Sequence, residues 1–447
     1  KTSKMPDNSP AAATTVAAEA DIIRPRLRTD HHIWGIYIVL LIFSVIELFS
    51  ASSQEVRVDD IYGPLVRHAQ FLVAGFGIML VIQHFHYRYV VKAIPWLVIG
   101  SILAMLYVLV AGVTINGARR GMRLAGMVIL PAEFIKLAVA LGVALIMSRY
   151  QVKGRRDVAR HGIILCVVLT LVSSGLLFTQ GLTNTLLLMC ISMAMMAIGG
   201  VGFRKFWTVI LIYGLIGGGA LGVKMLTARN AAPTPEAIEM ARLNHEEVGQ
   251  GNTSDRSATW TGRISRHFRL NKHQDPISDI NKQEQLSYIA QAHGGITGVG
   301  PGKSRENARL PLAFSDYIFA IIVEECGLVF SVFLLLCYLW LLGRAGFVAV
   351  RLRRTPACFL MIGCGVYIVI QALFHMAIVS GVFPVSGQPL PLISKGGTSV
   401  LATSVALGVM LSVSRHAART DDTDTEAATR ELQSLPENLR TDNPTQL

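Results

Sequence analysis

Residues 90–112 read VVKAIPWLVIGSILAMLYVLVAG and contain one charged side chain, Lys92. A run of about 20 apolar residues is long enough to cross the hydrocarbon core of a bilayer as a helix. Similar runs recur along the 447 residues, of which 52% are hydrophobic and 16% charged. Soluble domains have about 25% charged residues. The sequence therefore predicts an all-α polytopic membrane protein and excludes a soluble enzyme.

Ten transmembrane helices are predicted from these runs. They cover residues 34–52, 65–85, 90–112, 131–149, 161–180, 183–200, 204–226, 316–343, 357–383 and 391–413. The result is a ten-span membrane domain at 31–414, with one large extracytoplasmic loop at 227–313 between spans seven and eight. The polar ends, 1–30 and 415–447, are poor in large apolar residues and are expected to be disordered cytoplasmic tails.

The formal net charge of +12 follows from the same topology. With both termini in the cytoplasm, every inner segment carries Lys or Arg, as cytoplasmic loops do. No nucleic-acid partner is therefore expected. The six cysteines lie in apolar runs without metal-ligand spacing, so neither a metal site nor a disulfide framework is predicted.

One short outer segment breaks the charge rule. Residues 113–130 carry Arg119, Arg120 and Arg123 and no acid. Arginine suits the recognition of phosphate oxygens, because its guanidinium presents a rigid fork of donors. We therefore expect an outward-facing site for an anion at these residues.

Glu133 and Lys136 stand at the start of the predicted span 131–149. Ionisable side chains inside a bilayer are costly and commonly functional. A spacing of three residues puts both on one helix face, where they can pair. Two interpretations stay open: a pair that only steadies packing, or a pair that completes the basic outer site.

Asp316 is the candidate catalytic carboxylate. It lies at the start of the predicted span 316–343, directly after the large loop. Partial desolvation at a membrane mouth raises a carboxyl pKa toward values that suit a general base. The alternative is an acid that begins the helix and interacts favourably with the N-terminal dipole.

Two glycine-rich segments complete the set of candidates. Residues 294–304 read GGITGVGPGKS, and their backbone with Lys303 and Ser304 could close over a diphosphate, although the segment is no nucleotide-binding P-loop. Residues 381–399 read GVFPVSGQPLPLISKGGTS. Irregular backbone at membrane depth is tolerated only where it is buried or lines a cavity. We expect this second segment, which includes Lys395, to form a cavity wall.

These motifs together resemble the SEDS family (shape, elongation, division and sporulation), ten-span glycosyltransferases that polymerise lipid II. The motifs are Gly117-Ala118-Arg119-Arg120 with Pro131 to Lys136; Gly300-Pro301-Gly302-Lys303-Ser304; Ser315 to Ala320 with Glu324-Glu325; and Pro384 to Ser399. The form of the glycine-rich loop is more similar to the division branch of the family than to the elongation branch. The chain departs from the usual pattern at Gly121, His375 and Lys395, where Trp, Asn and Tyr are usual.

The resemblance implies a peptidoglycan glycosyltransferase of the inner membrane that works on the outer face, at the division septum. It implies Asp316 as the catalytic residue, with Arg120, Glu133 and Lys136 as further site residues. Together with the candidates found above, the predicted substrate and diphosphate site comprises Arg119, Arg120, Arg123, Glu133, Lys136, Lys303, Ser304 and Lys395. The resemblance also implies undecaprenyl-linked glycan as a substrate, and a class B penicillin-binding transpeptidase and other division proteins as partners. No cofactor is required by the residues, although a divalent cation, Mg²⁺ or Mn²⁺, could bridge the diphosphate.

Three other functions are consistent with the same residues. A lipid II flippase would use intramembrane charges and a polar cavity equally well. A polymerase of the elongation branch would share the chemistry, and a scaffold for division proteins would need none of it.

Overall fold

The computed structural model describes most of the membrane domain. The described residues are 29–51, 63–115, 118–124, 127–152, 157–230, 263, 267–268, 277–278, 281–310, 312–352 and 354–434. The predicted tails at 1–28 and 435–447, and most of the large loop between 231 and 280, lie outside them.

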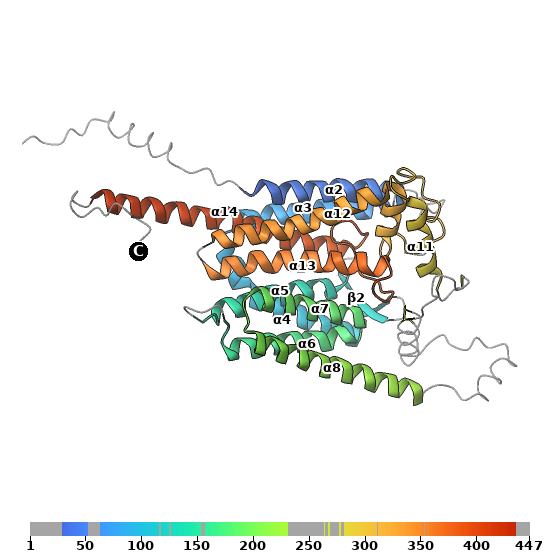
Figure 1. Ribbon diagram of the computed structural model, residues 1–447, viewed down its shortest axis with the longest axis horizontal. Coiled ribbons are helices and arrows are strands. Elements are labelled where there is room, and N and C mark those ends of the chain that lie inside the picture. The colour runs from blue at the N-terminus through green and yellow to red at the C-terminus, as the bar shows by residue number, and fades with distance from the viewer. Residues whose placement is uncertain are drawn as a thin grey trace, which may run out of the picture.

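Long helices that run side by side along one axis form the body of the protein (Figure 1). They are α2 (His31–Ala51), α3 (Gly63–His84), α4 (Tyr87–Ala111), α5 (Pro131–Arg149), α6 (Arg160–Phe178), α7 (Leu182–Ile198), α8 (Phe203–Asn230), α12 (Ile318–Arg351), α13 (Thr355–Val379) and α14 (Gly397–Ser434). A shorter helix, α11 (Lys282–Gly294), lies within the part predicted as the large loop. The start of α2 and the end of α14 lie at the same end of the bundle (Figure 1).

The helical multi-pass architecture predicted from the sequence is confirmed. Among the described residues, seven helices are long and apolar enough to cross a membrane: α3 from Val66, α4, α5, α6, α12, α13 and α14 up to His416. Two more, in α2 and α7, are apolar but shorter, at His31–Glu47 and Leu182–Ile198. Each of the ten predicted spans overlaps a helix, and the count of ten crossings stays a prediction.

α5 and α13 occupy the interior of the bundle. The small side chains of α5, such as Ala140 and Ala144, are fully buried and let neighbouring helices approach closely. By contrast, Trp96 and Val110 on α4 are 76% and 78% exposed. A wide exposed apolar surface is what helices facing lipid require, because bilayer and core are equally apolar.

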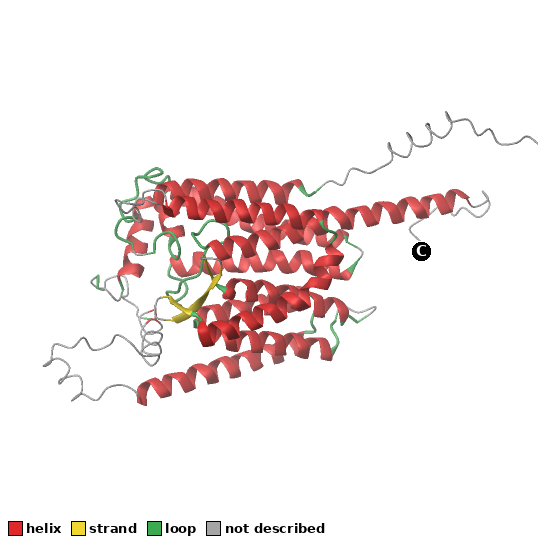
Figure 2. Cartoon of the chain, turned by 180° about the vertical axis from the view of Figure 1, so that it is seen from behind, coloured by secondary structure: helices red, strands yellow, loops and turns green. Residues whose placement is uncertain are grey.

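The all-α prediction is wrong in one place. Within the predicted outer loop 113–130, β1 (Val113–Ile115), β2 (Ala118–Leu124) and β3 (Met127–Ile129) form an antiparallel sheet in the order β1-β2-β3. Figure 2 shows the strands at one end of the bundle. Hydropathy over a 20-residue window cannot detect such short strands. The dipeptide Asn116-Gly117, a common hairpin signal in a sequence, could have indicated that the segments before and after it pair as strands.

The eighth and tenth predicted spans begin later than predicted, and the second predicted tail is partly helical. Asp316 precedes the first helical residue of α12, and residues 391–396 precede α14. α14 continues to Ser434, so residues 415–434 are helical rather than disordered. Extending a helix that already exists needs no new nucleus, which is the costly step, and these residues include strong helix formers such as Ala, Arg and Glu.

Candidate active site

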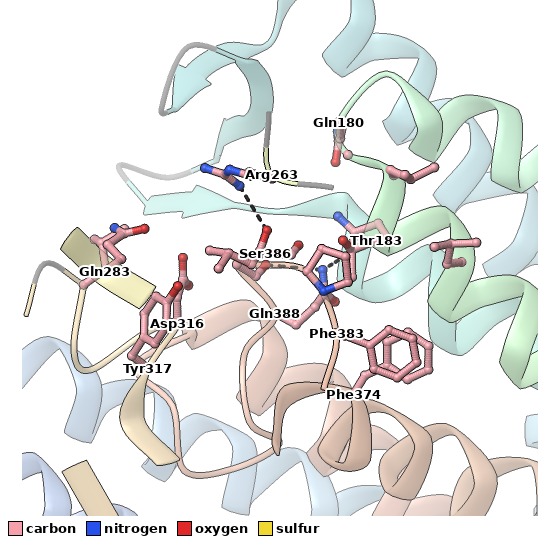
Figure 3. A pocket seen from close by; sticks show the side chains of 18 of the residues that line it. Gln180, Thr183, Arg263, Gln283, Asp316, Tyr317, Phe374, Phe383, Ser386 and Gln388 are labelled. Atoms are coloured by element: carbon pink, nitrogen blue, oxygen red, sulfur yellow. Dashed lines mark hydrogen bonds between the residues drawn. The ribbon is translucent and has the colours of Figure 1, made fainter. Parts of the chain in front are cut away.

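A polar cavity of about 460 Å³ opens at the end of the bundle where the sheet lies. Its lining comes from β2, from the start of α7, from the turn before α12, and from residues 383–388 between α13 and α14, with Arg263 and Gln283 from the predicted large loop. Figure 3 shows side chains from these separate segments pointing toward one another. The segment 381–399 was expected to form a cavity wall, and residues 383–388 do so.

Asp316 lies in this cavity. Its carboxylate accepts a hydrogen bond from Ser315 Oγ at 2.6 Å. Burial raises the pKa of the Asp316 carboxyl, and the Ser315 hydroxyl and the positive charges of Arg120 and Arg263 oppose that rise. A side chain at Gly387 would collide with the carboxylate, so the backbone there lies directly against it. The predicted catalytic residue is therefore held in a wall of the cavity rather than on the lipid side.

Of the three arginines in the predicted outer loop 113–130, only Arg120 lines the cavity. Val113 pairs with Gly121 and Thr114 with Arg119, which makes Arg120 the extra, unpaired residue of a β-bulge in β2. A bulge re-aims the side chain of its extra residue. Arg120 Nη2 donates to the carbonyl oxygen of Gln180 at 3.1 Å, beside the start of α7.

Arg119 and Arg123 are exposed on the same strand and do not line the cavity. Arg119 Nη1 donates to the carbonyl oxygens of Leu109 and Val110 at 3.1 and 2.7 Å, at the end of α4. The three arginines are close in sequence, but Arg119 and Arg123 do not share the cavity with Arg120.

Arg263 supplies a cation that sequence reasoning missed. It lines the cavity, and its Nη1 donates to the carbonyl oxygen of Val385 at 3.2 Å. Its charge acts on Asp316 and on Arg120, so the three groups lie close together. Burial lowers the pKa of Arg120, while Asp316 raises it and Arg263 lowers it further. No sequence signal separates Arg263 from the other charges of its long loop.

Glu133 and Lys136 form the expected pair, with Lys136 Nζ 2.7 Å from Glu133 Oε1. Lys136 is fully buried and does not line the cavity. Its ammonium lies behind the wall, 3.5 Å from Oε1 of Gln388, which does line the cavity. Glu133 Oε2 accepts a hydrogen bond from Gln371 Nε2 at 3.0 Å. Among the described cavity-lining residues, Gln388 is the one that the pair contacts through Lys136.

The glycine-rich loop 294–304 packs against α12. Ser304 Oγ donates to Glu324 Oε2 at 2.5 Å, and the N–H of Gly302 donates to Glu325 Oε2 at 3.1 Å. Gly327, with a φ of 79°, lets α12 pass against the loop, since a Cβ there would meet the oxygen of Ile296. The donors of the loop thus hold two glutamates of α12. Lys303 is exposed, and neither Lys303 nor Ser304 lines the cavity.

The two departures near the last span have different neighbours. The backbone N–H of Lys395 donates to the oxygen of Phe314 at 3.0 Å, and its charge acts on His68 of α3. Lys395 does not line the cavity. The ring of His375, on α13, forms a hydrogen bond through Nδ1 to the backbone oxygen of Gln388 at 2.5 Å. His375 therefore fixes the same segment that Lys136 contacts.

One carboxylate and two guanidinium groups converge in the cavity, which suits proton abstraction beside a developing anion. Within the described residues, no group of three or more His, Cys, Asp or Glu side chains could hold a metal ion.

Comparisons with known proteins identify the family of the chain and the fold that it shares with solved structures. The model of the FtsW, RodA and SpoVE family, described as "Cell cycle protein", matches residues 30–233 and 253–419. A probable peptidoglycan glycosyltransferase FtsW from Enterococcus hirae is 26% identical over 397 residues, which cover 87% of this chain and 92% of that protein. The rod shape determining protein RodA of Thermus thermophilus has a similar fold, with a TM-score of 0.57 at 22% identity over 88% of this chain and 98% of RodA. A chain from a structure titled "Structural coordination of polymerization and crosslinking by a peptidoglycan synthase complex" gives a TM-score of 0.60 at 23% identity, over 87% of this chain and 98% of that one.

Proposed function

Because this chain belongs to the FtsW, RodA and SpoVE family, whose model matches most of its length, we propose that it is a peptidoglycan glycosyltransferase. Its substrate is lipid II, which it polymerises into glycan strands with release of undecaprenyl diphosphate. The similarity to relatives known as probable peptidoglycan glycosyltransferases FtsW supports this activity. The family predicted from the motifs is thereby confirmed.

One observation carries the mechanism: Asp316 lies in a polar cavity within the electrostatic reach of Arg120 and Arg263. Asp316 takes the proton from a sugar hydroxyl of the acceptor as that oxygen bonds to the anomeric carbon of the donor. The bond from this carbon to the diphosphate breaks, and negative charge grows on the leaving oxygens. Preorganised cations stabilise such charge most effectively in a site that excludes water.

The cavity is proposed to face the outer side of the cytoplasmic membrane, with ten crossings and both termini in the cytoplasm. α5 starts at the sheet and ends at Arg149, so Arg149 and Arg160 at the start of α6 lie at the end of the bundle away from the cavity. A basic end is typical of the cytoplasmic side.

The proposed partner is a class B penicillin-binding transpeptidase, with other division proteins at the septum. The similarity in fold to a chain from a peptidoglycan synthase complex supports such an assembly. The proposal assigns the chain to the division branch, because the relatives that match it over most of its length have the name FtsW. The fold similarity to RodA leaves the elongation branch as the second candidate.

Lipid II polymerisation by the purified protein in detergent tests the proposed function. Detergent has no two sides to flip between, so a flippase would leave lipid II unchanged, whereas a polymerase makes glycan strands visible on a gel. The assay is run with and without the transpeptidase partner. Failure to form strands under both conditions would refute the activity.

A further inference from the structure

Two side-chain amides meet on the cavity wall. Gln388 Nε2 donates to Asn184 Oδ1 at 2.9 Å, although 204 residues separate them. Asn184 is the third residue of α7, and Gln388 is 2% exposed. Both line the cavity. Gln388 belongs to the segment predicted to form a cavity wall, whereas Asn184 was not predicted from the sequence.

The buried charge behind the wall sets the orientation of both amides. Lys136 can only donate, so the atom of Gln388 that faces it is the oxygen, at 3.5 Å. The nitrogen of Gln388 then faces Asn184 and also donates to the carbonyl oxygen of Gly387 at 3.2 Å. Asn184 must accept with its oxygen. Its Nδ2 group therefore remains as a donor, and no described residue accepts from it.

The cavity has a charged part and a less polar part. Figure 3 shows Asp316 and Arg263 on one side of Gln388, and Phe374 and Phe383 on the other. The two phenylalanine rings stack with their centroids 5.1 Å apart, and Leu186 adds another apolar side chain to the lining. The neutral donor of Asn184, in a cavity with this apolar part, suits a ligand group that has an uncharged carbonyl and a methyl group. The charged part suits a diphosphate.

We propose that Asn184 is a specificity-determining residue that donates from Nδ2 to the carbonyl oxygen of an acetamido group on the substrate sugar, with its polarity fixed by Lys136 through Gln388. This assignment rests on the proposed function, since the sugars of lipid II carry acetamido groups. Lys136 and Gln388 are then positioning residues, because they act through Asn184.

The test compares polymerisation of lipid II with that of an analogue whose sugar acetamido groups are free amines. Asn184→Asp keeps an acceptor for Gln388 but presents an acceptor to the substrate instead of a donor. Gln388→Glu leaves Asn184 in place, but the new carboxylate can only accept, from Lys136 and from Asn184. Asn184 must then donate to it from Nδ2, so the Asn184 oxygen faces the cavity. In both variants the preference for the acetamido substrate should fall by about tenfold or more, as expected for one hydrogen bond.

The matched control is Asn281→Asp, the same chemical change at a residue that does not line the cavity. Its substrate preference should equal that of the unchanged protein. Thermal unfolding in detergent checks that all variants are folded, and the ratio of rates on the two substrates is insensitive to a uniform loss of active protein.

The outcomes separate the two claims. If the unchanged protein makes strands but both variants slow the two substrates by one common factor, Asn184 is not a specificity residue and the proposed function stands. If the unchanged protein makes strands from neither substrate, the proposed function fails and this inference fails with it.

Discussion

The buried pair of Glu133 and Lys136 gives the sharpest test of how the site is built. The perturbation is a set of three variants: Glu133→Gln, Lys136→Met and the double variant. Lys136→Met removes the donor to Glu133 Oε1 and to Gln388, and leaves Gln371 as the partner of Glu133. Glu133→Gln leaves a buried ammonium with only neutral acceptors.

The expected loss of stability follows from the geometry. Two unit charges 2.7 Å apart attract by about 6 kcal/mol at an effective dielectric constant of about 20. Measured losses on breaking one side of a buried pair are about 3–5 kcal/mol, because the remaining charge has no compensation. Each single variant should lose stability on this scale. The double variant should recover most of it, because no buried charge remains.

Activity should not recover with stability. In the double variant Gln388 has no ammonium to fix which end of its amide faces Asn184. The donor that Asn184 presents to the cavity is then no longer fixed. Free energies of unfolding in detergent and rates of lipid II polymerisation are measured on all four proteins. A double variant that is both stable and fully active would refute the argument.

The control for this cycle is the pair of Asp157 and Lys205, 2.5 Å apart and 31% exposed on each side chain. An ion pair of this exposure contributes about 0–1 kcal/mol. Asp157→Asn and Lys205→Met should therefore change stability little and leave polymerisation intact. Equal losses in the buried and the exposed pair would contradict the role of burial.

Four further predictions concern the cavity. Asp316→Asn should abolish strand formation on a gel while thermal unfolding stays unchanged, because an amide cannot accept the proton. Arg120→Ala should lower turnover by roughly 10²–10³, because a preorganised cation is lost. Arg120→Lys should keep only part of the turnover, since Lys lacks the guanidinium fork. Equal rates for Arg120→Ala and the unchanged protein would remove Arg120 from the site. Gly387→Ala should displace the Asp316 carboxylate and reduce kcat without removing a charge, and an unchanged kcat would contradict that contact. Arg263→Gln should move the acid limb of the pH profile of kcat/KM to higher pH. Burial already raises the pKa of Asp316, and the loss of a nearby cation raises that pKa further. An acid limb that stays at the same pH would show that Asp316 is not the base.

Several features of the protein could be predicted because they depend on short stretches of chain. Hydropathy is summed over neighbours, so the membrane helices appear in the sequence wherever about 20 apolar residues follow one another. Asp316 was found by the same local logic, as a carboxylate at the boundary between a polar loop and an apolar run. The pairing of Glu133 with Lys136 follows from a helical spacing of three residues, and the structure has it.

The sequence alone determined the class of the protein, the approximate helices and the candidate base. The tertiary structure decided which cations reach that base. Arg120 enters the cavity because a bulge in β2 turns it away from its neighbours, and Arg263 arrives from a distant loop. Gln388 meets Asn184 and Lys136 across 204 and 252 residues. Contacts of this kind depend on how helices far apart in the chain pack together, and local sequence patterns do not record that packing.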